Sequence, residues 1–194
     1  MGENMANNIR KKTLFVTKLG VLAALSMVLA FLFHFPIIPA VSFLEYDPAD
    51  IPIMLGTFAL GPWAGLILTV IVSVIQGCTV SAASSWYGIV MHIIATGTYV
   101  LFAGLTYKHD KTKRGAILSL IFGVAAWVAV MIPANLFLTP VYLEVIVGLP
   151  AEAAKATVKS LLVPILIFNL IKSVLNSAVT FFTYKPLSGI LHKQ

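Results

Sequence analysis

Charged residues are scarce in this chain: Asp, Glu, Lys and Arg make up only 10% of its 194 residues. Soluble proteins carry about a quarter charged residues, because a folded chain must cover its surface with polar groups. Hydrophobic residues here reach 59%, and the mean hydropathy is +0.97. The composition therefore excludes an ordinary soluble domain and predicts a surface that mostly faces lipid.

The sequence also has only one cysteine and lacks three common catalytic and phosphate-binding motifs. The single cysteine, Cys78, cannot form a disulfide within the chain and argues against a metal site. The sequence has no phosphate-binding G-x-x-x-x-G-K-[ST] loop, no H-E-x-x-H and no G-x-S-x-G. The apolar segments contain no pair of carboxylates that would indicate a proton relay. We therefore expect no cofactor, no metal and no ATP hydrolysis by this chain.

What the sequence has is apolar segments long enough to be membrane helices. They run from about residues 14–33, 51–60, 63–76, 86–107, 116–138 and 161–184. The first segment follows a basic N-terminus, but it is long enough to span and has no convincing cleavage site, so we interpret it as a retained helix. The prediction is one all-α integral membrane domain, residues 1–194, with six transmembrane helices.

The stretch Ile51–Gln76 could be one tilted span or two short helices joined at Gly61-Pro62. With six spans, both termini lie in the cytoplasm together with ten of the thirteen basic residues. These ten are Arg10, Lys11, Lys12, Lys18, Lys108, Lys111, Lys113, Arg114, Lys185 and Lys193. Five spans would put a basic cluster outside, against the positive-inside rule. We therefore favour two short helices with a Gly-Pro turn, in a bacterial plasma (inner) membrane, and the excess of positive charge needs no nucleic acid partner.

The two short helices predicted at residues 51–60 and 63–76 cannot cross about 30 Å alone. Such helices occur in membranes when they are buried in protein or line a cavity. An internal site is therefore expected, and the last apolar segment has the residues for one. Asn169, Lys172 and Asn176 share one helical face with Ser173 and Thr180. A lysine within a span costs about 2.5–3.5 kcal/mol and faces a cavity or a partner. No acidic residue lies within a predicted span, so Lys172 either contacts a ligand or bonds to backbone carbonyls between helices.

Other candidate ligand contacts are Asn135, Gln76, Glu45 and Tyr46. Asn135 follows Pro133, so it either reads the edge of a planar heterocycle or caps the helix beside the proline. Glu45 and Tyr46 end an apolar first loop that either packs down as a lid or inserts in the membrane interface. We assign two further acids of this loop to structure, with Asp50 as a helix N-cap, and we assign His92 to polar packing. Gln76 ends the third helix and is predicted to face the same outer cavity.

Small residues on the first helix, Gly20, Ala23 and Ala24, allow close helix approach. They serve either internal packing or docking of another membrane subunit.

These residues together resemble a known family, the substrate-binding (S) subunits of energy-coupling-factor (ECF) vitamin transporters. Leu44-Glu45-Tyr46-Asp47-Pro48 through Pro52, with Phe58 to Gly65, is similar to the family's helix 2–helix 3 hairpin. Pro133-Ala134-Asn135, with Thr139 to Tyr142, forms a second match. Asn169-x-x-Lys172, with Asn176-Ser177, resembles the riboflavin-specific branch and not S subunits in general.

The resemblance implies a transport subunit and not an enzyme. It would bind riboflavin at the outer face through Asn135, Asn169 and Lys172. It would then dock through Gly20, Ala23 and Ala24 on a transmembrane coupling subunit, powered by two ATPase subunits. One departure is Gln76-Gly77-Cys78-Thr79, where the resemblance leads us to expect a lysine-asparagine pair as in many relatives, so the phosphorylated flavin (FMN) or another vitamin stays open. A membrane enzyme using a buried Lys172 and a self-contained channel also stay open, although the sequence offers no second catalytic group and no continuous polar path.

Overall fold

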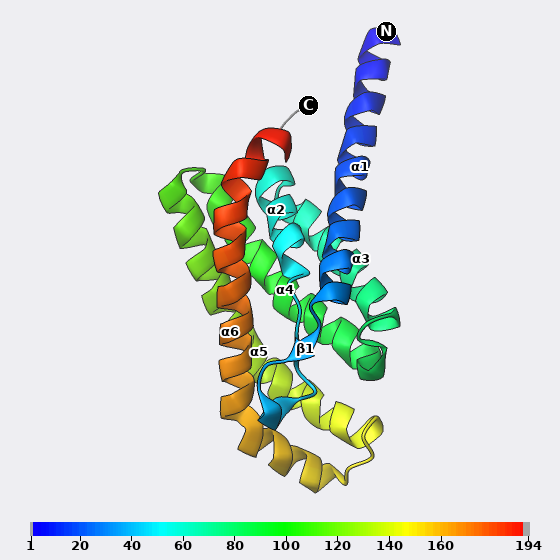
Figure 1. The fold of residues 1–194 in the computed structure, drawn as a ribbon, viewed down its shortest axis with the longest axis vertical. Coiled ribbons are helices and arrows are strands. Elements are labelled where there is room, and N and C mark those ends of the chain that lie inside the picture. Colours follow the sequence, from blue (N-terminus) through cyan, green and yellow to red (C-terminus); the bar gives the residue numbers. More distant parts are fainter. Residues whose placement is uncertain (1, 192–194) are drawn as a thin grey trace.

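The computed structural model describes residues 2–191, which form six α-helices and one short β-hairpin (Figure 1). The helices are α1 (Gly2–Leu32), α2 (Asp50–Leu60), α3 (Pro62–Cys78), α4 (Ser85–His109), α5 (Lys113–Val145) and α6 (Ala151–Leu191). The hairpin pairs β1 (Phe35–Pro36) with β2 (Glu45–Tyr46) in antiparallel register, and single 3₁₀ turns lie at Pro39–Val41 and Ala82–Ser84. All six predicted segments are helical.

Three of the helices extend well beyond the predicted apolar segments. Helix α1 begins at Gly2 rather than near residue 14, since the polar N-terminal residues continue the helix. The long connection expected at 139–160 shrinks to 146–150, because α5 runs on to Val145 and α6 already begins at Ala151. Pro133 and Pro140 lie inside α5 and do not end it. Neighbouring helices can satisfy backbone groups that a proline frees in a membrane helix.

Within the described part of the chain, four helical segments are long and apolar enough to cross a membrane: 4–32, 82–109, 113–145 and 151–184. Helices α2 and α3 are shorter, and α2 is buried along most of its length, with Ile53 and Met54 fully enclosed. The chain turns between them at Gly61, whose φ of 100° favours glycine, and Pro62 opens α3. A short helix buried in protein needs no lipid contact on its own.

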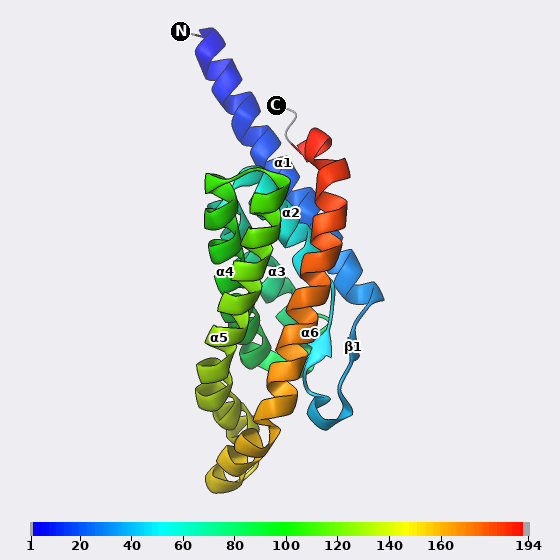
Figure 2. The same cartoon turned by 90° about the vertical axis from the view of Figure 1, so that its left-hand side faces the viewer.

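The helix bundle has two ends, at which different connections and chain termini lie (Figure 2). Both termini and the α4–α5 turn lie at one end, which we call the terminus end. The hairpin and the α5–α6 connection lie at the other, which we call the loop end. Helices α5 and α6 bend toward the loop end (Figure 1), in segments that contain Pro133, Pro140 and Pro164.

The apolar first loop, residues 33–49 between α1 and α2, packs against α6. Val41 is fully buried and forms a small core with Ile165 and Phe168 of α6, around which Phe43 and Leu44 pack. Of the two roles that the sequence left open for this loop, the structure has the lid-like one. The loop thereby covers the interior of the bundle at the loop end.

Candidate binding site

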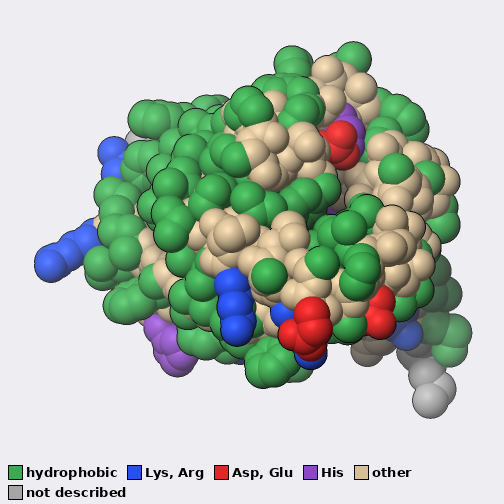
Figure 3. Space-filling view, turned by 90° about the horizontal axis from the view of Figure 1, so that it is seen from below, with side chains coloured by type: hydrophobic (Ala, Val, Ile, Leu, Met, Phe, Trp, Pro, Cys, Tyr) green, Lys and Arg blue, Asp and Glu red, His purple; other side chains and the backbone are tan. Residues whose placement is uncertain are grey.

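A cavity of about 110 Å³ lies under the first loop, at the loop end of the bundle. Its walls come from the first loop and from α3, α4, α5 and α6, so it is lined by segments far apart in the sequence. The space-filling view of the loop end shows mostly apolar and neutral polar atoms, with a few acidic and basic side chains (Figure 3). The site is therefore a partly open pocket at a largely apolar end of the molecule.

The predicted polar stripe of α6 faces the protein interior. Its predicted members are Asn169, Lys172, Ser173, Asn176 and Thr180, all of them buried, and the structure adds Ser177 to the buried polar groups. Leu170 and Val174, on the opposite face, are 48% and 47% exposed. The helical periodicity thus placed the polar groups correctly, because an apolar face toward lipid leaves the polar face for the core.

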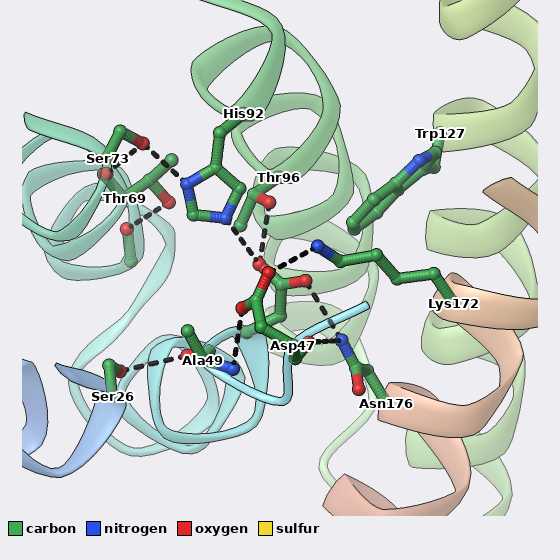
Figure 4. Close-up of polar contacts among 12 residues, drawn as sticks. Ser26, Asp47, Ala49, Thr69, Ser73, His92, Thr96, Trp127, Lys172 and Asn176 are labelled. Carbon is green, nitrogen blue, oxygen red and sulfur yellow. Dashed lines mark hydrogen bonds and ion pairs between the residues drawn. The ribbon is translucent and has the colours of Figure 1, made fainter. Parts of the chain in front are cut away.

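Lys172 has an acidic partner, which no local sequence pattern indicated. Its Nζ donates to Asp47 Oδ2 at 2.7 Å, and both side chains are over 90% buried (Figure 4). Asp47 lies outside every predicted span, but the first loop folds back and brings it to α6. The other oxygen, Oδ1, accepts from the backbone N–H of Ala49 at 3.0 Å and fixes the turn into α2. Asp47 therefore has the expected structural role and also neutralises the buried lysine.

Asp50 is not the N-cap of α2; Ala49 holds that position and Asp50 is the first residue of the helix. Its carboxylate is fully buried and accepts from Thr96 Oγ1 at 2.7 Å and Asn176 Nδ2 at 2.9 Å. His92 Nε2 lies 3.0 Å away, and His92 Nδ1 lies 2.9 Å from Ser73 Oγ. Side chains of several helices thus meet on one carboxylate, and His92 has the polar packing role that its sequence context indicated.

Asn176 belongs to this network and does not line the cavity. Its Oδ1 accepts from the Tyr46 hydroxyl at 3.1 Å, while its Nδ2 also approaches the carbonyl of Asp47. Burial raises the pKa of Tyr46, although Lys172 acts in the other direction, so Tyr46 donates as a neutral phenol. These bonds fasten the end of the first loop to α6.

Asn169 faces the cavity together with a set of aromatic side chains. Its Oδ1 accepts from Trp127 Nε1 at 2.9 Å and its Nδ2 donates to the carbonyl of Ile165. The aromatic members of the wall are Phe43, Tyr87, Trp127 and Phe168. Large aromatic faces beside an amide and an ammonium suit a planar, polar ligand.

The remaining predicted contacts divide between the cavity and the core. Gln76 and Glu45 line the cavity, and Glu45 forms a hydrogen bond with His34. Asn135 lies outside it: its amide donates to the carbonyl of Met131 and accepts from Thr139, within its own helix. Asn135 does not cap the helix beside Pro133, because α5 continues to Val145, and ligand contact by Asn135 stays a prediction.

The small residues of α1 lie on two faces of the helix, one exposed and one buried. Gly20 and Ala24 are exposed, whereas Ala23 is only 8% exposed and belongs to the hydrophobic core. Ala23 thus serves internal packing, because it lies on the face of α1 that contacts the bundle. The exposed face continues through Val16 and Val28 at four-residue spacing.

Comparison with known proteins agrees with this architecture. Residues 14–184 match the family described as "ECF transporter, substrate-specific component". The chain belongs to this family. It is 28% identical to the riboflavin transporter RibU of Staphylococcus aureus (strain TCH60), with 98% of this chain and 96% of the relative covered. It is 29% identical to the riboflavin transporter FmnP of Bacillus subtilis (strain 168), with 95% of both chains covered.

The fold is also that of a solved S component. The structure described as "Structure and mechanism of the S component of a bacterial ECF transporter" superposes with a TM-score of 0.75 at 25% identity. It covers 94% of this chain and 99% of that one. This S component is thus a membrane transport subunit and not an enzyme, so catalysis by Lys172 is set aside.

Sequence reasoning missed two groups of residues in the S component. Asp47 and Asp50 were assigned to structural roles only, but a buried lysine demands a countercharge, and the acids of the first loop were the available ones. Trp127 gave no periodic signal in an apolar helix. Its one clue is that a buried indole N–H requires an acceptor.

Proposed function

We propose that this S component binds riboflavin in the cavity under the first loop, as the substrate-binding subunit of an ATP-driven uptake system. The observation that carries the proposal is the cavity with Lys172, Asn169 and four aromatic side chains on its wall. Two relatives that match nearly end to end are named riboflavin transporters. An isoalloxazine ring offers planar faces for the aromatic wall and carbonyl and nitrogen atoms for the amide and ammonium donors.

Lys172 and Asn169 supply directed donors, and Gln76 supplies a third amide at the end of α3. An amide both donates and accepts, so it can pair with the edge of a heterocycle as well as with the ribityl hydroxyls. Asn135 would contribute from α5 only if its bonds to Met131 and Thr139 were exchanged for bonds to the ligand.

Riboflavin entry requires the first loop to move. The cavity of about 110 Å³ is smaller than the roughly 300–1,000 Å³ of pockets that enclose comparable ligands. Asp47 sits on this loop and is paired with Lys172. Outward movement of the loop would break this pair, and a ligand carbonyl would then accept from Lys172 in place of the carboxylate. The ammonium would then keep a hydrogen-bond acceptor while it loses its countercharge, so binding must offset the cost of breaking the pair.

The proposed orientation puts the loop end outside and both termini in the cytoplasm, with six passes through the bacterial plasma membrane. Basic residues of the N-terminal part of α1 and of the α4–α5 turn lie at the terminus end, as the positive-inside rule predicts. Docking on the coupling subunit would use Gly20 and Ala24, which are exposed on α1. Two ATPase subunits would then drive reorientation and release of the vitamin inward.

The test is the absorbance spectrum of the purified protein, followed by fluorescence titration with riboflavin. We expect tight, saturable quenching that weakens strongly in Lys172→Met and in Asn169→Ala. Lys159→Met is the matched control, since it makes the same substitution at an exposed lysine outside the cavity wall. Absence of flavin binding by well-folded protein would reject the substrate and leave the S-component fold in place.

FMN is the second candidate, because this chain has Gln76-Gly77-Cys78-Thr79 where a lysine-asparagine pair is expected in many relatives. The first loop brings Glu45 and Asp47 to the cavity, and carboxylates repel a phosphate group. We therefore expect FMN to compete for the site more weakly than riboflavin. Equal or tighter competition by FMN would reverse the assignment of the two flavins.

A further inference from the structure

A second recess lies at the terminus end, far from the cavity under the first loop. It has a volume of about 620 Å³ and is formed by the α4–α5 turn and the ends of α2, α4, α5 and α6. Aromatic side chains form its floor, among them Phe58, Tyr107 and Tyr184. Lys111, Thr112 and Lys113 stand at its edge and are exposed. The recess therefore combines an apolar floor with a basic rim.

This recess opens into a long apolar groove between α5 and α6. The groove has a volume of about 820 Å³ and shares Phe181 and Phe182 with the recess. Its walls include Ile121 and Val174, which are 56% and 47% exposed. Recess and groove thus form one continuous surface that is basic at one end and apolar along the rest.

The dimensions of the groove suit an acyl chain. Along α5 it extends from Ile117 to Ile132, which at 1.5 Å per residue is about 22 Å. One leaflet accounts for about half of the ~30 Å hydrocarbon core, or roughly 15 Å. A chain whose head lies at the basic rim can therefore follow the groove through the whole depth of its leaflet.

The rim favours an anion at the head of that chain. Residues 108–114 contain Lys108, Lys111, Lys113 and Arg114 against Asp110. Asp110 accepts from the backbone N–H of Thr112, and bonds with this residue hold the pKa of Asp110 below its ordinary value. The turn thus carries one fixed negative charge and four positive ones. Helix α5 begins at Lys113, so its positive dipole end points to the same place.

We infer that this surface binds an anionic phospholipid, with the phosphate headgroup at Lys111 and Lys113 and one acyl chain in the α5–α6 groove. The charge at the rim selects the headgroup, and the apolar groove holds the chain. The site is separate from the cavity under the first loop and shares none of its lining residues.

The experiment is native mass spectrometry of the full chain released from detergent. The protein is titrated with palmitoyl-oleoyl phosphatidylglycerol or with phosphatidylcholine of the same acyl chains. We expect one phosphatidylglycerol molecule to be retained at concentrations that leave phosphatidylcholine unbound. Each lysine near an anionic lipid contributes about a fivefold preference, so Lys111→Gln with Lys113→Gln should lower the preference about 25-fold.

The matched control is Lys11→Gln with Lys12→Gln. These lysines are exposed and lie on the part of α1 that projects beyond the bundle at the same end (Figure 1). The control removes the same charge and should keep the preference. Ala125→Trp fills the exposed groove without touching the rim, and it should weaken retention of the lipid with both lysines intact.

Three results would overturn the proposal. Equal retention of the two lipids by the unchanged protein would remove the anion preference. Equal loss in the two lysine pairs would reduce the effect to overall charge. A preference that survives Lys111→Gln with Lys113→Gln would place the lipid elsewhere. Thermal unfolding of each variant in detergent checks that the fold is kept.

Discussion

The two ends of the bundle bury polar groups in different ways. At the loop end the interior contains full charges, Lys172 with Asp47 and the carboxylate of Asp50. At the terminus end the interior polar groups are hydroxyls on an aromatic cluster, in which Tyr107 lies 4.4 Å from Phe58 and 5.6 Å from Tyr184 between ring centroids. Both arrangements pack α2, α4 and α6 against one another. Packing of these helices therefore does not itself require buried charge.

The difference points to function at the loop end. Removing an ion from water costs several kcal/mol, and a buried pair is often no more stable than apolar residues of the same volume. The charged groups lie beside the cavity, whereas the aromatic cluster lies far from it. Charges kept at a cost to stability, next to a pocket, are typical of a ligand site.

The largest effect is expected from breaking the ion pair at the loop end. Asp47→Asn keeps an oxygen for the Ala49 N–H but leaves Lys172 without a countercharge. We expect a loss of about 3–5 kcal/mol in the free energy of unfolding, measured by equilibrium unfolding in mixed detergent micelles.

The control for that loss is the double variant Asp47→Asn with Lys172→Met. It contains no buried charge at this position, so its stability should return to near that of the unchanged protein while riboflavin binding stays weak. A double variant as unstable as the single one would mean that packing, and not charge, is lost.

The second effect concerns Asp50, whose carboxylate accepts from Thr96 and Asn176 and lies 3.0 Å from His92 Nε2. Asp50→Asn replaces an acceptor that Thr96 and Asn176 both use. Hydrogen bonds to charged groups contribute about 1.5–3 kcal/mol each, or about 3–6 kcal/mol for the two. Asparagine keeps one acceptor oxygen, so we expect about half of this, a loss of about 2–3 kcal/mol, by the same unfolding measurement. Thr96→Val, which removes a single donor, should cost about half as much; an equal cost would contradict the shared role of this carboxylate.

The third prediction separates two amides on one face of α6. Asn169 lines the cavity and Asn176 does not. Asn169→Ala should weaken riboflavin binding about tenfold, the equivalent of about 1.4 kcal/mol for a lost directed hydrogen bond. Asn176→Ala should instead lower stability and leave affinity within about threefold, because it fastens Tyr46 and Asp50. Titration and unfolding of both variants decide it, and the reverse pattern would exclude the cavity as the flavin site.

How far the sequence could predict this molecule follows from the same comparison. The apolar runs located all six helices, and the 3.6-residue period identified the buried face of α6, because both depend on local pattern. The ends of α1 and α5 were missed since polar residues and prolines can continue a helix where neighbours satisfy the backbone. These features are set by the context of the fold and not by the segment itself.

The site was predictable where its groups lie on one helix and not where they come together through folding. Asn169 and Lys172 stood out as polar residues in an apolar run. Asp47 reaches Lys172 across 125 positions of sequence, and no local pattern shows that the first loop folds back. The one physical clue was that a buried lysine requires a negatively charged partner. This requirement predicts an acidic residue near Lys172 but does not identify which one.

The smallest effect is expected at the terminus end. Tyr107→Phe removes a hydroxyl that makes only long contacts, 3.3 Å to the Tyr184 hydroxyl and 3.5 Å to the carbonyl of Lys111. The ring contacts with Phe58 and Tyr184 remain, so we expect a loss of about 0.5 kcal/mol in the free energy of unfolding and unchanged riboflavin affinity. A loss as large as that of Asp50→Asn would contradict the comparison, because the terminus end would then depend on buried polar bonds as strongly as the loop end does. A small loss would place the costly polar interactions of this fold at the end where the cavity lies.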